Sequence, residues 1–183
     1  PVVFSNRLEK FCPTPLVKNI KGDFILVEDS NEKDLTKSFG RLNVFHGQMG
    51  MFVRAMSYML SHGADGLKQV SEDAVLNANY LRASLSSHLT PAFDGFCMHE
   101  ILFSDDFLKD TGVETLDFAK AMIDEGYHPM TIYFPLVIHG ALLVEPTETE
   151  SKQSLDHFIN TLCDLVERLK KDSDSFKAAP VFT

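Results

Sequence analysis

The sequence predicts an α+β fold in which a small antiparallel sheet is covered by helices on one face. Three observations support this. Amphipathic stretches with the 3.6-residue period of helices recur after residue 43, and short β-branched and aromatic runs separate them. The link between the last two such runs is too short for a parallel crossover, so these strands are expected to be antiparallel. The predicted order is helix, helix, strand, helix, strand, strand, helix.

The first 43 residues differ in pattern from the rest. Residues 23–28 (DFILVE) predict a strand, and Pro13-Thr14-Pro15 predicts an extended segment because each proline restricts the residue before it. The stretch carries too little apolar surface to fold alone. We therefore divide the chain into a lead-in, residues 1–43, and one domain, residues 44–183. The lead-in is expected to pack either against the domain that follows it or against a domain that this sequence does not contain.

Two helices are predicted to open that domain, from Val44 to about Gly63 and from Asp65 to about His88. Gly63 fits a left-handed helix terminator, and the short link predicts antiparallel neighbours. The first helix carries an apolar stripe that is expected to be buried. Its members are Phe45, Met49, Phe52, Val53, Met56, Met59 and Leu60.

Three further strands are predicted at residues 97–103 (CMHEILF), 131–134 (TIYF) and 141–145 (ALLVE). A third helix is predicted between the first two of these strands, with Thr115 as its cap and Glu125 at its end. The last helix is predicted to begin at a capping box formed by Thr147 and Glu150, and to extend to Leu169.

The composition of the chain excludes some classes of binding partner and indicates a cellular compartment. The net charge is −9 and no Lys/Arg cluster occurs, which argues against nucleic acid and anionic membranes. No apolar run approaches the roughly 18 residues of a membrane span. No secretory leader follows Pro1, so the chain is expected to begin inside a longer protein. Three widely separated cysteines indicate a reducing, cytoplasmic location.

Familiar catalytic motifs are absent from the sequence. His99-Glu100 lacks the second histidine of a zinc-protease helix, so no metal site is expected. Cys97 shows no feature that would lower its thiol pKa. Two polar segments remain, residues 127–131 and 144–150. Each has two interpretations: a hydrogen-bonded turn or strand end followed by a helix cap, or a group of side chains that face a cleft.

These two segments carry a family resemblance. Residues 145–151 (EPTETES) and 126–135 (GYHPMTIYFP) resemble stretches of glycine dehydrogenase (decarboxylating), the P-protein of the glycine cleavage system. Residues 63–70, 74–81 and 97–100 (CMHE) resemble further segments of it. The order and spacing agree from about Phe39 to Leu169. The form Tyr133-Phe134-Pro135 is similar to the second subunit of the bacterial two-subunit enzyme.

The chain also departs from that family. Met130 stands where the family usually has a second proline, and His46 is inserted in the polar part of a glycine-containing helix start. Neither the family's His-Lys pair nor its glycine-rich phosphate loop occurs. The resemblance therefore implies the C-terminal small domain of a fold-type-I pyridoxal phosphate enzyme, with residues 1–43 belonging to the large domain. No catalytic or cofactor-binding residue is expected in this chain, and by itself it is expected to be inactive.

The resemblance implies an oxidoreductase of glycine catabolism. The intact enzyme would use pyridoxal phosphate, bound by a lysine absent here, to decarboxylate glycine and pass the aminomethyl group to the lipoylated H-protein. The implied partners are the N-terminal cofactor domain or subunit, the H-protein and glycine, in a homo- or hetero-oligomer. His128 and Thr131 are the first candidates for substrate binding. Glu145 and Glu148 are expected at the rim near the lipoyl entrance.

Two alternatives stay open. The chain could be the small domain of another fold-type-I enzyme, such as an aminotransferase or an amino-acid decarboxylase. Such a domain would be expected to carry a carboxylate-binding arginine in a strand, and the three predicted strands of the domain contain none. The chain could instead be a free-standing regulatory or dimerisation module.

Overall fold

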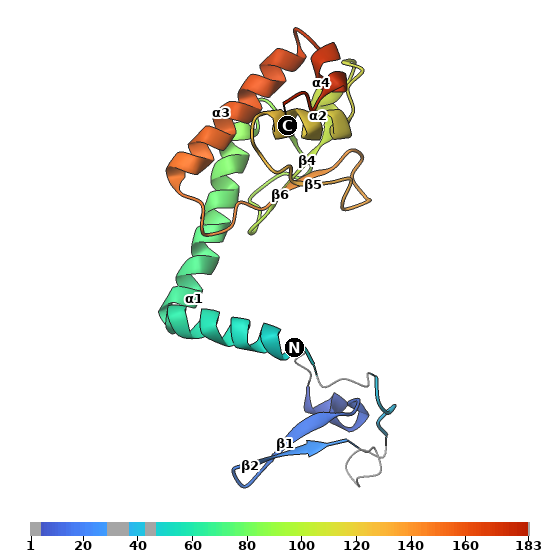
Figure 1. The fold of residues 1–183 in the computed structure, drawn as a ribbon, viewed down its shortest axis with the longest axis vertical. Helices are drawn as coiled ribbons and strands as arrows, with labels where there is room; N and C mark the ends of the chain where they lie inside the picture. The colour runs from blue at the N-terminus through green and yellow to red at the C-terminus, as the bar shows by residue number, and fades with distance from the viewer. Residues whose placement is uncertain (1–4, 29–36, 43–46, 183) are drawn as a thin grey trace. The chain divides into compact units, whose positions relative to one another are not determined.

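The computed structural model describes residues 5–28, 37–42 and 47–182, in two compact units, Pro1–Tyr58 and Met59–Thr183 (Figure 1). The predicted domain boundary between residues 43 and 44 lies outside the described residues and stays a prediction. The same holds for the predicted helix start at Val44 and for Phe45. Within the described ranges, no helix is long and apolar enough to cross a membrane.

The first unit contains a 3₁₀ helix, η1 (Asn6–Phe11), and a hairpin of β1 (Leu16–Ile20) and β2 (Asp23–Val27). The strands are antiparallel, with Ile20 opposite Asp23. Both turn residues, Lys21 and Gly22, have positive φ, as a two-residue type I′ turn requires. The strand predicted at residues 23–28 is confirmed, whereas β1 was not predicted because Lys18 and Asn19 interrupt its apolar pattern.

Helix α1 (Met49–Leu85) consists of two helical segments that meet at a kink at Gly63, in agreement with the two helices that the sequence predicts. Only Gly63 leaves the helical conformation, and its positive φ of 64° agrees with the predicted left-handed residue. A one-residue interruption is too short for the loop of two to five residues that joins antiparallel helices, so only the predicted antiparallel arrangement of the two helices is wrong.

The predicted burial of the first apolar stripe is also wrong. Its described members are between 50% and 73% exposed. We call them the α1 stripe: Met49, Phe52, Val53, Met56, Met59 and Leu60. The 3.6-residue period is present as predicted, but none of the described elements covers this face of the helix.

The second unit contains the four-stranded sheet β3 (Thr90–Pro91), β4 (Ile101–Ser104), β6 (Leu142–Val144) and β5 (Thr131–Ile132), in that order. All neighbouring pairs are antiparallel, which confirms the predicted sheet and the pairing of its last two strands. The strands are shorter than predicted. Residues 97–100 lie outside β4 because the backbone of Cys97 is bound to the side chain of Asn79 instead.

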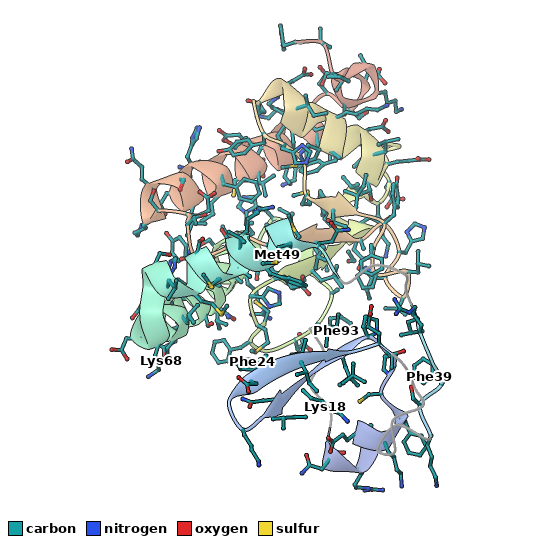
Figure 2. All side chains as sticks on the ribbon, turned by 60° about the horizontal axis from the view of Figure 1, so that its bottom comes forward. Lys18, Phe24, Phe39, Met49, Lys68 and Phe93 are labelled. Atoms are coloured by element: carbon teal, nitrogen blue, oxygen red, sulfur yellow. The ribbon has the colours of Figure 1, made fainter. Side chains whose placement is uncertain are left out.

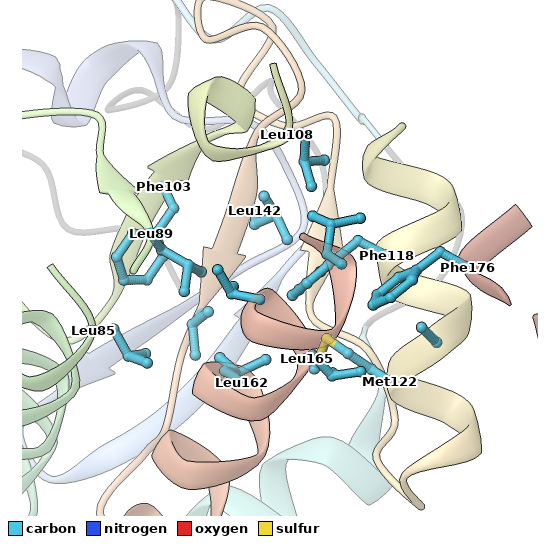
Figure 3. Packing of buried hydrophobic residues seen from close by; sticks show 14 of the residues in the cluster. Leu85, Leu89, Phe103, Leu108, Phe118, Met122, Leu142, Leu162, Leu165 and Phe176 are labelled. Carbon is cyan, nitrogen blue, oxygen red and sulfur yellow. The ribbon is translucent and has the colours of Figure 1, made fainter. Parts of the chain in front are cut away.

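Helices pack against one face of this sheet: α1, α2 (Thr115–Asp124), α3 (Lys152–Leu169) and the short α4 (Asp174–Ala178), while η3 (Asp105–Leu108) follows β4 (Figures 1 and 3). Along β4, Ile101 and Phe103 are buried while Leu102 is half-buried, the alternation of a sheet covered on one side. Phe118 of α2 stacks on Phe176 of α4, with ring centroids 6.1 Å apart. This arrangement confirms the predicted fold class.

Both predicted helix caps are displaced. Glu114 rather than Thr115 caps α2, and the Asp117 carboxylate accepts a hydrogen bond from the Glu114 N–H at 3.1 Å. Thr115 is buried, and its hydroxyl donates to the carbonyl of Gly140 at 2.9 Å. Burial against a neighbouring loop thus gives Thr115 a different partner from the one its sequence position predicts.

Helix α3 begins five residues after the predicted cap at Thr147. Ser151 is the N-cap, and its hydroxyl accepts the N–H of Ser154 at 3.1 Å. Thr147 has a φ of 60°, which is incompatible with the extended backbone of an N-cap. Residues 147–150 therefore form a separate loop before the helix, and the predicted capping box is wrong.

Candidate functional site

A cleft of about 700 Å³ lies in the second unit, between the turn after α2, the end of β6 and the start of α3. Its apolar lining includes Leu81, Leu143, Val144, Leu155 and Phe158. Its polar lining consists of Glu125, His128, Thr131, Glu145, Glu150, Ser154 and His157. Both polar segments that the sequence singled out therefore reach the same cleft.

The turn that carries His128 is fixed against α3. Tyr127 makes an edge-to-face contact with Phe158, with centroids 5.2 Å apart, and its ring lies 6.0 Å from that of His157. Contacts of this geometry stabilise aromatic pairs by about 0.5–1.5 kcal/mol beyond area burial. His128 follows directly and is exposed on the cleft wall. The contacts of Tyr127 thus fix the turn that carries His128.

Strand pairing brings the second segment to the same wall. Thr131 opens β5 opposite Leu143 of β6, and Glu145 follows Leu143 by two residues. Side chains two apart on an extended segment point the same way, so Glu145 continues the side of Leu143. The Glu145 Oε1 atom lies 3.7 Å from Nε2 of His99.

His128, Thr131 and Glu145 thus line the same cleft. Glu148 is not among the residues that line the cleft; it is half-buried in the loop before α3. Contact of any of these four residues with substrate remains a prediction.

Other residues of the cleft were not predicted as site residues. Glu150 lies in a motif that the sequence singled out, but its spacing assigned it to a helix cap. His157 and Ser154 lie on α3, beside positions of its apolar face, and nothing in their spacing distinguishes them. Glu125 lines the cleft and pairs with Arg168 of α3. Ser154 and His157 join the site through packing of α3 against the sheet, whereas Glu125 and Glu150 reach it from the end of α2 and from the loop before α3.

The cleft suits ligands that donate hydrogen bonds or carry positive charge. Three carboxylates and two imidazoles line it, and Glu145 and Glu150 are exposed. Such groups accept hydrogen bonds and exchange protons. Cys97 is not among the residues that line this cleft, and burial raises the pKa of its thiol more than the backbone hydrogen bond lowers it.

Comparison with known proteins places the chain in a family. A sequence model described as glycine dehydrogenase, C-terminal domain, matches residues 70–179, more than half of the chain. The chain belongs to this family. Among its relatives is a protein of Caulobacter vibrioides described as "Probable glycine dehydrogenase (decarboxylating) subunit 2", which is 60% identical over 98% of the chain. A protein of Kosmotoga olearia with the same description is 46% identical over the whole chain.

The chain spans about a third of these relatives, 35% of the first and 37% of the second. A solved structure described as glycine decarboxylase (P-protein) of the glycine cleavage system, in inhibitor-bound form, shares the fold. Its TM-score is 0.67 at 20% identity, over 87% of this chain and 37% of that one. The family resemblance read from the sequence and the fold it implies are confirmed.

The residues of the cleft do not by themselves fit pyridoxal phosphate. None of the described residues that line it is a lysine, although a Schiff base requires an amine. Lys152 is not among the lining residues, and hydrogen bonds to Asp156 and Tyr80 raise its pKa above the ordinary value. The carboxylates of Glu125, Glu145 and Glu150 would repel a phosphate. We therefore derive no chemical step through the cofactor in this chain.

Proposed function

We propose that this chain is the C-terminal part of a glycine dehydrogenase (decarboxylating) of the two-subunit type, and that it supplies a wall of the substrate site. The enzyme as a whole decarboxylates glycine and transfers the aminomethyl group to the lipoyl arm of the H-protein. One observation carries the proposal. The two segments that resemble the family, 126–135 and 145–151, are far apart in sequence and line one cleft.

Within that site, His128 and Thr131 contact the substrate, and Glu145 with Glu148 form the rim near the lipoyl entrance. The exposed imidazole and hydroxyl offer a donor and an acceptor beside an apolar surface, which is typical of a binding pocket. Glu145 supplies its carboxylate to this rim from the cleft wall, and Glu148 supplies its carboxylate from the adjoining loop.

The cofactor is held outside this chain, by the lysine and phosphate loop of the N-terminal domain or subunit. The isolated chain is therefore inactive. Mixing it with pyridoxal phosphate, followed by gel filtration, should leave no new absorbance band in the protein peak. A band that persists with the protein, or glycine-dependent CO₂ exchange by the chain alone, would contradict this part of the proposal.

The other subunit or domain covers the α1 stripe. Six apolar side chains at helical spacing are at least half exposed, and contiguous patches of this kind mark protein interfaces. The relatives are nearly three times as long as this chain, so enough polypeptide exists to cover it. We also assign the enzyme to the cytoplasm, because Cys12, Cys97 and Cys163 are unpaired thiols.

The test of the site uses the assembled enzyme with glycine-dependent CO₂ exchange as the assay. His128→Ala should lower kcat/KM at least about tenfold, the equivalent of losing ~1.4 kcal/mol of binding. His88→Ala is the matched control, since His88 lies in the turn after α1 and is not among the residues that line the cleft. Equal activity of the His128 variant and the control would remove His128 from the site.

A further inference from the structure

Two asparagines of α1 each form hydrogen bonds to the backbone of a different loop. Asn77 and Asn79 are two positions apart, so on a helix their side chains point to different sides. Each reaches a segment far away in sequence, and each segment leads to one member of the His99–Glu145 pair.

Asn77 binds the loop that carries Glu145 and Glu150. Its side-chain amide donates to the carbonyl of Thr147 at 2.9 Å, and a longer contact of 3.4 Å reaches the carbonyl of Glu150. Thr147 has a φ of 60°, a left-handed conformation that is unfavourable for a β-branched residue. Such a backbone persists only where surrounding contacts hold it, and Asn77 supplies one of them.

Asn79 binds the segment that leads to His99. Its Nδ2 donates to the carbonyl of Cys97 at 2.7 Å, and its Oδ1 accepts the Cys97 N–H at 3.0 Å. These two hydrogen bonds satisfy both the N–H and the carbonyl of Cys97, which would otherwise pair with a neighbouring strand. His99 lies two residues further, with Nε2 3.7 Å from Oε1 of Glu145.

We propose that Asn77 and Asn79 are positioning residues that hold Glu145 in place. Asn77 acts through the loop that follows Glu145, and Asn79 acts through the segment that carries His99, the imidazole beside Glu145. Neither asparagine is among the residues that line the cleft. Their effect on catalysis is indirect, and it rests on the proposed role of Glu145 at the lipoyl entrance. Two side-chain amides on different sides of α1 would in this way act on the same carboxylate, that of Glu145.

The first experiment tests whether Asn77 holds the loop of residues 145–151, and it uses hydrogen exchange with mass spectrometry on this chain. Asn77→Asp keeps the side-chain shape but cannot donate to a carbonyl. In the peptide that spans residues 145–151, the N–H of Thr149, which donates to the Thr147 hydroxyl at 3.4 Å, should exchange at least about tenfold faster, as expected for the loss of ~1.4 kcal/mol of protection. Asn160→Asp makes the same charge change at an exposed position of α3 and should leave that peptide unchanged. Unchanged exchange in the Asn77 variant overturns the proposal.

The second experiment measures positioning, in the assembled enzyme. Asn77→Asp and Asn79→Asp should raise the KM for the lipoylated H-protein several-fold and leave the KM for glycine within twofold, while Asn160→Asp changes neither. A variant that merely destabilised the fold would lower kcat and leave both KM values unchanged, and that result overturns the proposal.

A double variant separates this inference from the proposed function. In a Glu145→Ala background, Asn77→Asp should have no further effect, because both changes remove the same placed carboxylate. Additive effects overturn the positioning role. If Glu145→Ala alone leaves the KM for the H-protein unchanged, the proposed role of Glu145 fails. If it raises that KM and the asparagine variants do not, the present inference fails alone.

Discussion

The β1–β2 hairpin and the β3–β4–β6–β5 sheet are both antiparallel and both rich in apolar residues, yet their burial is opposite. In β2, only Val27 is buried, and Phe24, which Figure 2 labels, is 74% exposed. In the four-stranded sheet, Phe103 and Leu142 are fully buried under helices (Figure 3). The two sheets therefore differ in what covers them, and much less in strand composition.

This difference shows that apolar pattern alone does not make a core. The hairpin satisfies its backbone hydrogen bonds, but an isolated two-stranded hairpin has marginal stability without a layer on its face. The second unit supplies that layer from its own helices. We expect the first unit to receive it from the part of the relatives' length that this chain does not span. The α1 stripe has the same requirement.

The largest expected effect is a core truncation in the second unit. Phe118 is fully buried between Phe107 and Phe176. Phe118→Ala should lower the free energy of unfolding by about 3–5 kcal/mol. Phe24→Ala, the same change on the exposed hairpin, should stay within about 0.5 kcal/mol. Urea unfolding followed by circular dichroism measures both. Similar losses for the two variants would mean that the hairpin is covered in solution.

A smaller effect is expected at the helix starts of the two units. Ser151 caps α3 through its hydroxyl, whereas Ser5 precedes η1 without a side-chain cap bond. Ser151→Ala should cost about 1 kcal/mol, and Ser5→Ala should be neutral within about 0.5 kcal/mol. Thermal unfolding gives both values. A neutral result for Ser151→Ala together with a loss for Thr147→Ala would restore Thr147 as the cap.

The smallest effect concerns pH and the contact between α1 and α3. Hydrogen bonds from Lys152, and then from Tyr80, lower the pKa of Asp156 below its ordinary value. A carboxylate with a lowered folded-state pKa contributes stability above its unfolded pKa, and loses it as pH falls through the folded value. Below about pH 4 the parent should therefore lose stability more steeply than Asp156→Asn. Parallel acid unfolding curves for the two proteins would show that this network adds nothing.

The sequence by itself determined the family, the antiparallel sheet and most helices, because these depend on local periodicity and on motifs contiguous in the chain. It also pointed to the segments of His128 and Glu145, since polar residues at strand ends stand out in an apolar pattern.

Only the tertiary structure decided which groups meet. Thr115 and Thr147 have the chemistry of helix caps, but Thr115 is buried and bonded to Gly140, and Thr147 has a positive φ, so Glu114 and Ser151 take the cap positions. His157 entered the cleft through packing of α3 against the sheet. Whether an apolar stripe is buried depends on a covering element elsewhere in space, and for that reason its helical period alone did not predict the exposure of the α1 stripe.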